Sequence, residues 1–196
     1  MSDRTFSIAL IGGICAGKSI FAQHFSDLGA HVISADQFAK QLWNDKLIAA
    51  QIRDLFICPS EEFSLSYVRQ AILQEESKRK SLERLLHPMI LKQVAASIKN
   101  TQGPYCIVEM PLYVEINCAI NFDRVLLIDV PEHLQIQRML ERDLSEEQAR
   151  QFLSIQSMRE QRYKVAHEVI LNTIAKQHIE KAVTRLDRHY QLLSAN

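Results

Sequence analysis

Residues 12–19, with the sequence GGICAGKS, fit the phosphate-binding pattern G-x-x-x-x-G-K-[ST]. Three of the 5 glycines of the chain stand in the first six of these positions. Backbone N–H groups have to converge on phosphate in such a loop, so the chain must bend tightly and keep bulky side chains away. The pattern therefore predicts nucleotide binding by eight residues: Gly12, Gly13, Ile14, Cys15, Ala16, Gly17, Lys18 and Ser19.

Two of these side chains carry chemistry. Lys18 is expected to reach the β- and γ-phosphates and to offset their charge during transfer, and the Ser19 hydroxyl is expected to bind the Mg²⁺ of bound ATP. ATP and Mg²⁺ are therefore the expected cofactors. The alternative is a chance glycine-rich turn, but an apolar strand pattern precedes the match and a helical pattern follows it, as phosphate binding requires.

The loop alone does not choose the reaction. A GTPase would need a D-x-x-G switch and an N-K-x-D segment that reads guanine, and neither occurs in the sequence. ATP hydrolysis coupled to motion and phosphoryl transfer to a small acceptor both remain open. The alternatives are a nucleotide or shikimate-like kinase and a non-catalytic ATP-binding switch.

The elements that must position the loop follow from hydrophobic periodicity. Short apolar runs predict five strands, and helical patterns separate them, which indicates an α/β fold with a parallel sheet and crossover helices. The expected strands are residues 6–11, 31–34, 105–109, 125–130 and 169–171. We expect a three-layer P-loop NTPase domain with a five-stranded parallel sheet, a helical acceptor-binding insertion and an arginine-bearing lid.

The domain organisation follows from the same pattern. A length of 196 residues favours a single domain, with its core in residues 1–46, 101–131 and 165–196. Residues 47–100 are helical in period, are punctuated by Pro59 and Pro88, and are predicted to be the insertion. Residues 132–164 are helical and rich in arginine and are predicted to be the lid. An amphipathic helix from Ile174 closes the chain.

Composition limits the partners. Lys plus Arg and Asp plus Glu are both 23, so the net charge of zero argues against a general nucleic-acid binder and a polybasic membrane anchor. No run of about 18 apolar residues is present, so no membrane span is expected. The 4 widely spaced cysteines indicate neither a zinc site nor a disulfide framework, and they favour the cytoplasm. A monomer or a weak homo-oligomer is expected.

The order of several motifs resembles the dephospho-CoA kinases. That family opens with T-G-G-I-G-S-G-K-S and continues with V-I-D-A-D and L-x-H-P, and the counterparts in this chain are residues 11–19, 32–36 and 85–88. The family then has P-L-L-x-E, V-D, Q-x-x-R-x-x-x-R, a second Q-x-x-R and V-I-x-N. The corresponding segments are residues 111–115, 128–129, 135–142, 156–159 and 169–172.

This resemblance implies transfer of the ATP γ-phosphoryl group to the 3′-hydroxyl of dephospho-CoA. It implies Asp36 as the general base that also touches the acceptor, although Asp36 could instead only cap a helix beginning at Gln37. It implies that Arg138 contacts the nucleotide and that Arg142, four residues along the same helix face, clamps the transferring phosphate.

The resemblance also places His87, Pro111 and Leu112 against the acceptor, while His87 before a proline could simply cap a turn. Arg150 and Arg162 are left as surface residues, which is the usual role of a run of charges. Glu109 has a possible place near the Mg²⁺ water, against the simpler interpretation of a charge at a strand end.

The departures from the family pattern are Cys15 for glycine, Ala16 for serine, Ile20 for threonine and Ser34 for aspartate. Cys15 costs conformational freedom if its φ angle is positive. Because Gly17, Lys18, Ser19 and Asp36 remain, an active enzyme is expected.

Overall fold

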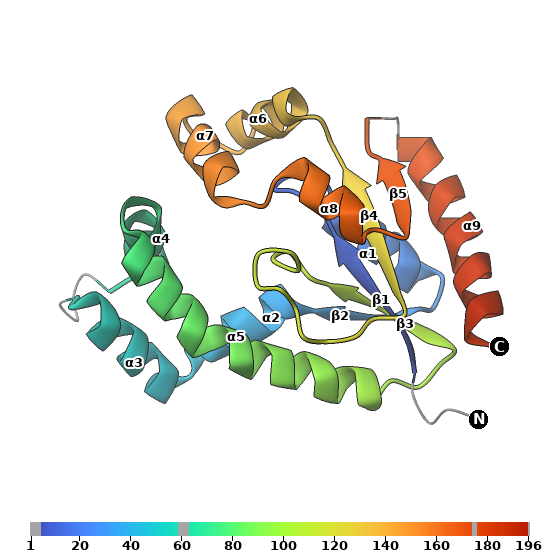
Figure 1. The fold of residues 1–196 in the computed structure, drawn as a ribbon, viewed down its shortest axis with the longest axis horizontal. Helices are drawn as coiled ribbons and strands as arrows, with labels where there is room; N and C mark the ends of the chain where they lie inside the picture. Colours follow the sequence, from blue (N-terminus) through green and yellow to red (C-terminus); the bar gives the residue numbers. More distant parts are fainter. Residues whose placement is uncertain (1–4, 59–62, 174–175, 196) are drawn as a thin grey trace. The chain divides into compact units, whose positions relative to one another are not determined.

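The computed structural model describes residues 5–58, 63–173 and 176–195, and it has the α/β architecture that the sequence predicts (Figure 1). Five parallel strands form one sheet in the order β2-β3-β1-β4-β5. The strands are β1 (Phe6–Ile11), β2 (His31–Ser34), β3 (Tyr105–Glu109), β4 (Arg124–Asp129) and β5 (Glu168–Leu171). The predicted sheet is confirmed, with β4 beginning and ending one residue earlier than expected and β5 beginning one residue earlier.

Helices connect the strands. Those before β3 are α1 (Lys18–Asp27), α2 (Ala35–Asn44), α3 (Lys46–Phe56), α4 (Leu65–Gln74) and α5 (Glu76–Lys99). Those after β4 are α6 (Glu132–Leu140), α7 (Glu146–Ile155), α8 (Arg159–Val165) and α9 (Lys176–Ser194). The start of the predicted closing helix at Ile174 lies outside the described residues.

The chain divides into two compact units. The sheet unit comprises Met1–Ala35 and Val94–Asn196, and the helical unit comprises Asp36–Gln93. The helical unit therefore includes nearly all of α2 and excludes the end of α5, so its bounds differ from those of the predicted insertion at residues 47–100. The acceptor-binding role of that insertion stays a prediction.

The core of the sheet unit lies between the sheet and the pair of helices α1 and α9, which pack on each other and on β3. The three central strands β1, β3 and β4 are short, nearly continuous buried runs, as expected where both faces of a parallel sheet are covered. Three fully buried rings, Phe25, Tyr105 and Tyr190, meet at centroid distances of 5.7 to 6.5 Å. Tyr105 Oη donates to Asp187 Oδ1 at 2.5 Å, which satisfies a buried hydroxyl.

The helical unit has a separate core. It is built on Ile52, Phe56 and Val68 and is covered by apolar residues of α4 and α5. The helix α5 continues through Pro88, so the alternative interpretation, in which His87 only caps a turn before this proline, is wrong. Leu85, Leu86 and Met89 pack on the same core, and their burial outweighs the hydrogen bond that Pro88 removes.

The start of α2 corrects a second expectation. The helix begins at Ala35, directly after β2, so Asp36 lies inside its first turn and is not the cap of a helix beginning at Gln37. An acidic side chain in the first turn is favoured by the positive end of the helix dipole. No described helix is both long enough and apolar enough to cross a membrane.

Candidate active site

The predicted phosphate-binding loop connects β1 to α1, so the strand, loop and helix arrangement is confirmed. Gly17 is the N-cap residue of α1 and has φ 92°, a left-handed conformation that favours glycine. A Cβ atom on Gly17 would also lie 2.5 Å from Asn172 Nδ2, which is closer than real contacts allow. The last glycine of the motif is therefore required both by backbone angle and by space.

Cys15 also has a positive φ, of 54°. The expected cost of a cysteine at this glycine position is therefore present, because non-glycine residues adopt this region at an energetic cost. The Cys15 side chain is half-buried and Ala16 is fully buried. The small side chains of Cys15 and Ala16 fit into the loop, and the strain lies in the Cys15 backbone.

Lys18 folds back over the loop. Its Nζ donates to the carbonyl oxygens of Gly12 at 2.9 Å and of Gly13 at 3.1 Å. These contacts hold the ammonium group beside Gly12 and Gly13 of the loop, and the motif predicts that this cation contacts the phosphates.

The next three carbonyls of the loop are held by side chains from far along the sequence. Gln135 Nε2 donates to Ile14 O at 2.6 Å, and Arg138 Nη1 donates to Cys15 O at 3.1 Å. Asn172 Nδ2 donates to Ala16 O at 2.8 Å. Five successive carbonyl oxygens, from residue 12 to residue 16, thus have a side-chain donor.

This carbonyl pattern decides where the N–H groups point. In a trans peptide unit the N–H is opposite the C=O, so the N–H groups of Gly13, Cys15 and Gly17 face away from the donors that hold the preceding carbonyls. The first N–H groups of α1 add to this surface because they have no partner inside the helix. These N–H groups lie at a helix N-terminus, on the side away from the carbonyl donors, and such groups can bind phosphate.

Three side chains from the predicted lid meet over Gly13. A Cβ on Gly13 would collide with Gln135 Nε2 and would lie 3.1 Å from Gln156 Oε1 and 3.4 Å from Arg162 Nη2. Gln156 Oε1 also accepts from the Ile14 N–H at 3.0 Å. Gly13 is therefore a glycine because other side chains occupy the space next to it.

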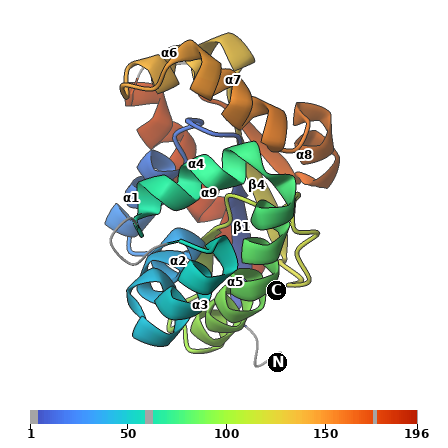
Figure 2. The ribbon, with the colours of Figure 1, turned by 90° about the vertical axis from the view of Figure 1, so that its left-hand side faces the viewer.

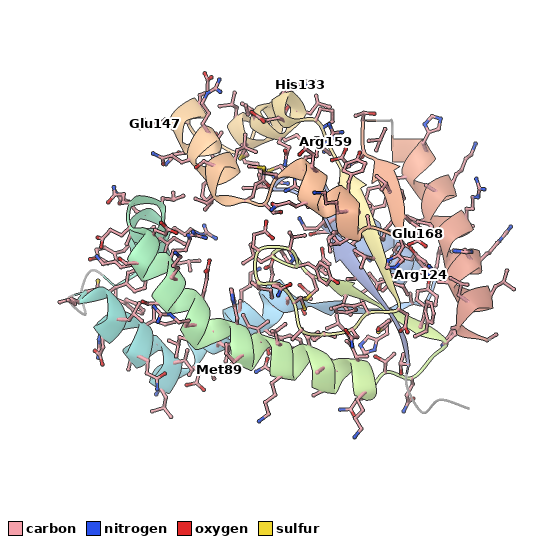
Figure 3. The ribbon with its side chains drawn as sticks, in the orientation of Figure 1. Met89, Arg124, His133, Glu147, Arg159 and Glu168 are labelled. Atoms are coloured by element: carbon pink, nitrogen blue, oxygen red, sulfur yellow. The ribbon has the colours of Figure 1, made fainter. Side chains whose placement is uncertain are left out.

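A buried ion pair lies at the end of β4. Asp129 is 2% exposed and accepts hydrogen bonds from Arg159 on α8 (Figure 3), including one from Nε at 2.9 Å, and from Tyr163 Oη at 2.8 Å. Burial raises the pKa of Asp129, but the hydrogen bonds from Arg159 and Tyr163 and the Arg159 charge outweigh it, so the net pKa is lowered. The backbone of Asp129 also accepts from the Asn172 N–H at 2.8 Å, which connects the pair to the loop.

The arginines of the predicted lid differ from expectation in two respects. Arg162 is 6% exposed, so its placement on the surface is wrong, because its side chain turns toward Ser157 and Gly13. Arg138 and Arg142 do not share a helix face, since α6 ends at Leu140 and Arg142 lies exposed in the turn that follows. Arg150 is exposed as expected and pairs with Glu146 at 2.6 Å.

Over the described residues, no cluster of three or more His, Cys, Asp or Glu side chains could hold a metal ion. Ser19 is exposed in the first turn of α1, and its hydroxyl is the kind of oxygen ligand that Mg²⁺ prefers.

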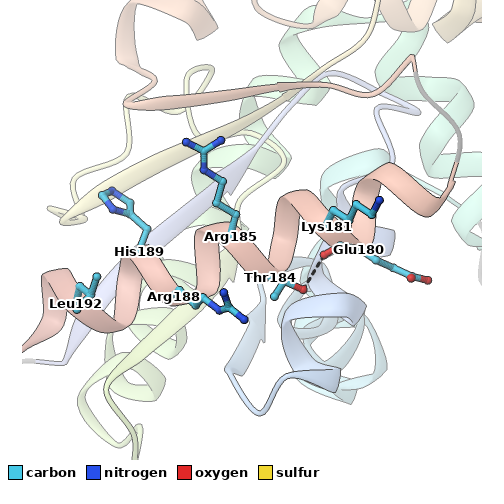
Figure 4. Close-up of a pocket in the computed structure, with 7 residues that line it drawn as sticks. All are labelled: Glu180, Lys181, Thr184, Arg185, Arg188, His189 and Leu192. Carbon is cyan, nitrogen blue, oxygen red and sulfur yellow. Dashed lines mark hydrogen bonds between the residues drawn. The ribbon is translucent and has the colours of Figure 1, made fainter.

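A surface pocket lies along α9, between Glu180 and Leu192 (Figure 4). It is lined by charges of both signs, and none of the predicted site residues belongs to it. It gives no reason to move the candidate site away from the loop.

Comparison with known proteins decides the family. The family model for dephospho-CoA kinase matches residues 6–177. The chain belongs to the dephospho-CoA kinase family. A dephospho-CoA kinase from Coxiella burnetii is 38% identical over 93% of this chain and 96% of its own length. A second, from Nitrosomonas europaea, is 36% identical over 95% of this chain and 96% of its own length. The solved protein TT1252 from Thermus thermophilus is similar in fold, with a TM-score of 0.80 and 22% identity over 95% of this chain and 98% of its own.

In this member of the dephospho-CoA kinase family, the residues expected to bind the acceptor lie in both units. Pro111 and Leu112 lie in the turn after β3, and Leu112 is 44% exposed. Asp36 and His87 belong to the helical unit, where Asp36 is exposed and His87 is half-buried. Burial lowers the pKa of His87, against the opposing charge of Glu83. Their roles toward an acceptor stay predictions.

Several residues that hold the loop were not among the predicted site residues. Gln135, Gln156 and Asn172 occur in the motifs that this kinase shares with its family, and the motif match was the signal that pointed to them. Spacing alone could not have found them, because they are 121 to 156 residues away from the atoms that they contact.

Proposed function

We propose that this protein transfers the γ-phosphoryl group of ATP to the 3′-hydroxyl of dephospho-CoA, giving CoA and ADP. The observation that carries the proposal is the phosphate-binding loop, whose carbonyls at residues 12–16 are all engaged by side chains while N–H groups face the opposite side. Family membership supplies the acceptor, since the named relatives with 38% and 36% identity are dephospho-CoA kinases.

The nucleotide side of the reaction uses groups of the sheet unit. The loop N–H groups and Lys18 bind the phosphates, and Arg138 supports the loop from the Cys15 carbonyl. Ser19 would hold Mg²⁺ together with the phosphates, and the ion would supply charge neutralisation during transfer. Removal of divalent ions with a chelator is expected to abolish turnover, which tests the metal requirement.

The acceptor side depends on a base and on binding residues. Asp36 accepts the proton as the 3′-oxygen of the acceptor bonds to phosphorus and the bond to the ADP oxygen breaks. Arg142 offsets the charge of the transferring group, and its exposed position in a turn leaves it accessible to an incoming phosphate. His87, Pro111 and Leu112 bind the acceptor. A cytoplasmic location and a monomer or weak homo-oligomer complete the proposal.

The decisive experiment measures ADP release from Mg·ATP with and without dephospho-CoA and identifies the product by mass. We expect ADP in proportion to dephospho-CoA, with one phosphate added to the acceptor. Shikimate and nucleoside monophosphates are the matched controls. ADP release that depends on one of these instead would point to another small-molecule kinase, and ATP binding without acceptor-dependent ADP would point to a switch.

A further inference from the structure

Two arginines three residues apart on α8 provide an internal comparison. Arg159 uses the edge of its guanidinium formed by Nε and Nη2, and both atoms donate to the Asp129 carboxylate. This edge presents two parallel N–H bonds and matches the two oxygens of a carboxylate or a phosphate. In Arg159 the edge is therefore already filled by an anion of the protein.

The same edge of Arg162 is not filled. Both hydrogen bonds that its guanidinium makes to described residues start from Nη1, one to Ser157 O and one to Ser157 Oγ at 3.2 Å. Its Nε is buried and has no hydrogen-bond partner among the described residues. Its Nη2 lies 3.4 Å from the position where a Cβ of Gly13 would stand, so the edge borders the phosphate-binding loop.

The carboxylates that act on Arg162 are engaged by other donors. Glu115 Oε1 accepts from the Ser157 N–H at 2.7 Å, and Asp129 accepts from Arg159 and Tyr163. Burial is the main influence on the Arg162 guanidinium and lowers its pKa, while Glu115 and Asp129 oppose this effect. A cation that is 6% exposed and has an unsatisfied N–H is costly to keep unless a ligand supplies the missing acceptor.

We propose that Arg162 binds a phosphate of the nucleotide through its Nε and Nη2 edge, beside Gly13, and is a catalytic residue of this kinase in addition to Lys18 and Arg142. The catalytic role of Arg162 rests on the proposed function. The contact between Arg162 and phosphate requires only that the protein binds a nucleotide. The contact places phosphate oxygens against the Nε and Nη2 edge, of which Nη2 lies near Gly13 of the loop. Ser157 fixes the guanidinium from the opposite side through Nη1, so the edge is oriented before the ligand arrives.

A purely structural role makes a different prediction. If Arg162 only holds the turn at Ser157, any side chain that keeps this turn should preserve phosphate binding. A phosphate contact instead requires the two-pronged edge, so Arg162→Lys, which keeps the charge, should still bind phosphate less well than the wild type. The choice of probe separates the two roles further, because adenosine has no phosphate for Arg162 to contact.

The test uses the full chain and inorganic tripolyphosphate, ATP and adenosine as probes. For Arg162→Gln we expect the Kd of tripolyphosphate and ATP to rise about tenfold or more, unchanged adenosine binding, and kcat about 10²-fold lower. Arg150→Gln, an exposed arginine of α7, is the matched control and should behave as wild type. A folded Arg162→Gln variant with wild-type tripolyphosphate affinity and kcat would overturn the proposal, as would full rescue by Arg162→Lys.

A second measurement needs no variant. In wild-type protein, the NMR signal of the Arg162 Nε–H, assigned through the bonds of its own side chain, should move on addition of tripolyphosphate and stay in place with adenosine. A signal that does not respond to tripolyphosphate at saturation contradicts the contact, even if both variants fail to fold. Because these readouts need no acceptor, a protein that binds tripolyphosphate as expected but does not phosphorylate dephospho-CoA would refute the proposed function and leave this inference standing.

Discussion

The phosphate-binding loop and the first half of α5 are stabilised in opposite ways. The loop carbonyls accept from Gln135, Arg138 and Asn172, which are more than 120 residues away in sequence. The charged residues of α5 instead pair with neighbours three or four positions away, as Lys80 does with Glu76 at 2.8 Å. The loop is therefore held by contacts from distant parts of the sheet unit, whereas these charged side chains of α5 (Figure 2) pair with neighbours along the same helix.

This difference predicts which substitutions matter. A change that removes a distant contact to the loop should alter nucleotide binding or stability, and a change in a local pair of α5 should alter neither. Residues with a direct chemical role stand outside this rule, and they provide the largest expected effects.

Asp36 tests the limit of the comparison, because it belongs to the helical unit but is predicted to act in the reaction. An amide can position a hydroxyl but cannot accept its proton, so Asp36→Asn should lower acceptor-dependent kcat by about 10²–10⁴. ATP affinity and melting temperature should stay at wild-type values. Asp45→Asn is the control, since Asp45 is the N-cap of α3 and asparagine caps about as well. A wild-type rate for Asp36→Asn would mean that the base is another residue.

Lys18 carries the next largest effect. Lys18→Ala removes a cation that offsets the charge of the γ-phosphate, which should lower kcat by about 10²–10³. It also leaves Gly12 O and Gly13 O without the Nζ donor, so ATP should bind more weakly. Steady-state kinetics and ATP titration measure both effects, with the exposed Lys181→Ala on α9 as control. Retention of more than half of the wild-type kcat would contradict the assignment of the loop.

The ion pair of Asp129 should have a pH-dependent effect. Asp129→Asn removes hydrogen bonds between charged groups that are partly buried, so the free energy of unfolding at neutral pH should fall by about 1.5–3 kcal/mol. Because the folded-state pKa of Asp129 is lowered, its contribution is complete above the unfolded-state pKa and is lost as pH falls through the folded-state value. Denaturant titrations from pH 7 to pH 3 should show wild type and variant converging in acid. A difference that stays constant across this range would contradict a lowered pKa for Asp129 in the folded protein.

Asn172 tests the loop support directly. Asn172→Ala removes the donor to Ala16 O and leaves that buried carbonyl unsatisfied, which should cost about 1–2 kcal/mol of stability. The N–H of Gly17 belongs to the same peptide unit, so ATP affinity should also decrease. Thermal melts with and without ATP measure the two effects, with the exposed Asn100→Ala as control. Unchanged ATP affinity would show that the loop keeps its shape without this contact.

The smallest effect is expected in α5. Lys80→Ala breaks a pair in which both side chains are more than half exposed, and such pairs contribute little. Melting temperature, ATP affinity and kcat should all equal those of wild type within error. A clear loss of ATP affinity in this variant would break the comparison between the loop and α5.

Local patterns in the sequence were enough for the sheet and for the loop. The apolar runs at Phe6–Ile11 and Tyr105–Glu109 are strands with the expected limits, because a buried parallel strand needs an uninterrupted apolar run. The spacing of glycine, lysine and serine in residues 12–19 predicted the phosphate-binding loop, because a tight turn, a cation and a hydroxyl for phosphate are needed at neighbouring positions.

Local patterns failed where packing competes with propensity. Pro88 was expected to punctuate the helical pattern of residues 47–100, yet α5 continues through it because its neighbours pack into the core of the helical unit. Asp36 could have capped a helix beginning at Gln37, yet α2 begins two residues earlier, at Ala35, directly after β2.

The tertiary structure alone decided which polar residues serve the loop. In the sequence, Arg162 and Arg150 are two arginines of one charged segment, but Arg150 is exposed and Arg162 is buried against Gly13. The difference arises because parallel strands bring their carboxyl ends to one edge of the sheet, so segments that follow β4 and β5 meet the loop that follows β1. The sequence by itself determined the elements and the chemical motif, since these depend on neighbours within a few positions. The partners of the loop depend on chain topology, which brings residues more than 100 positions apart within hydrogen-bond distance.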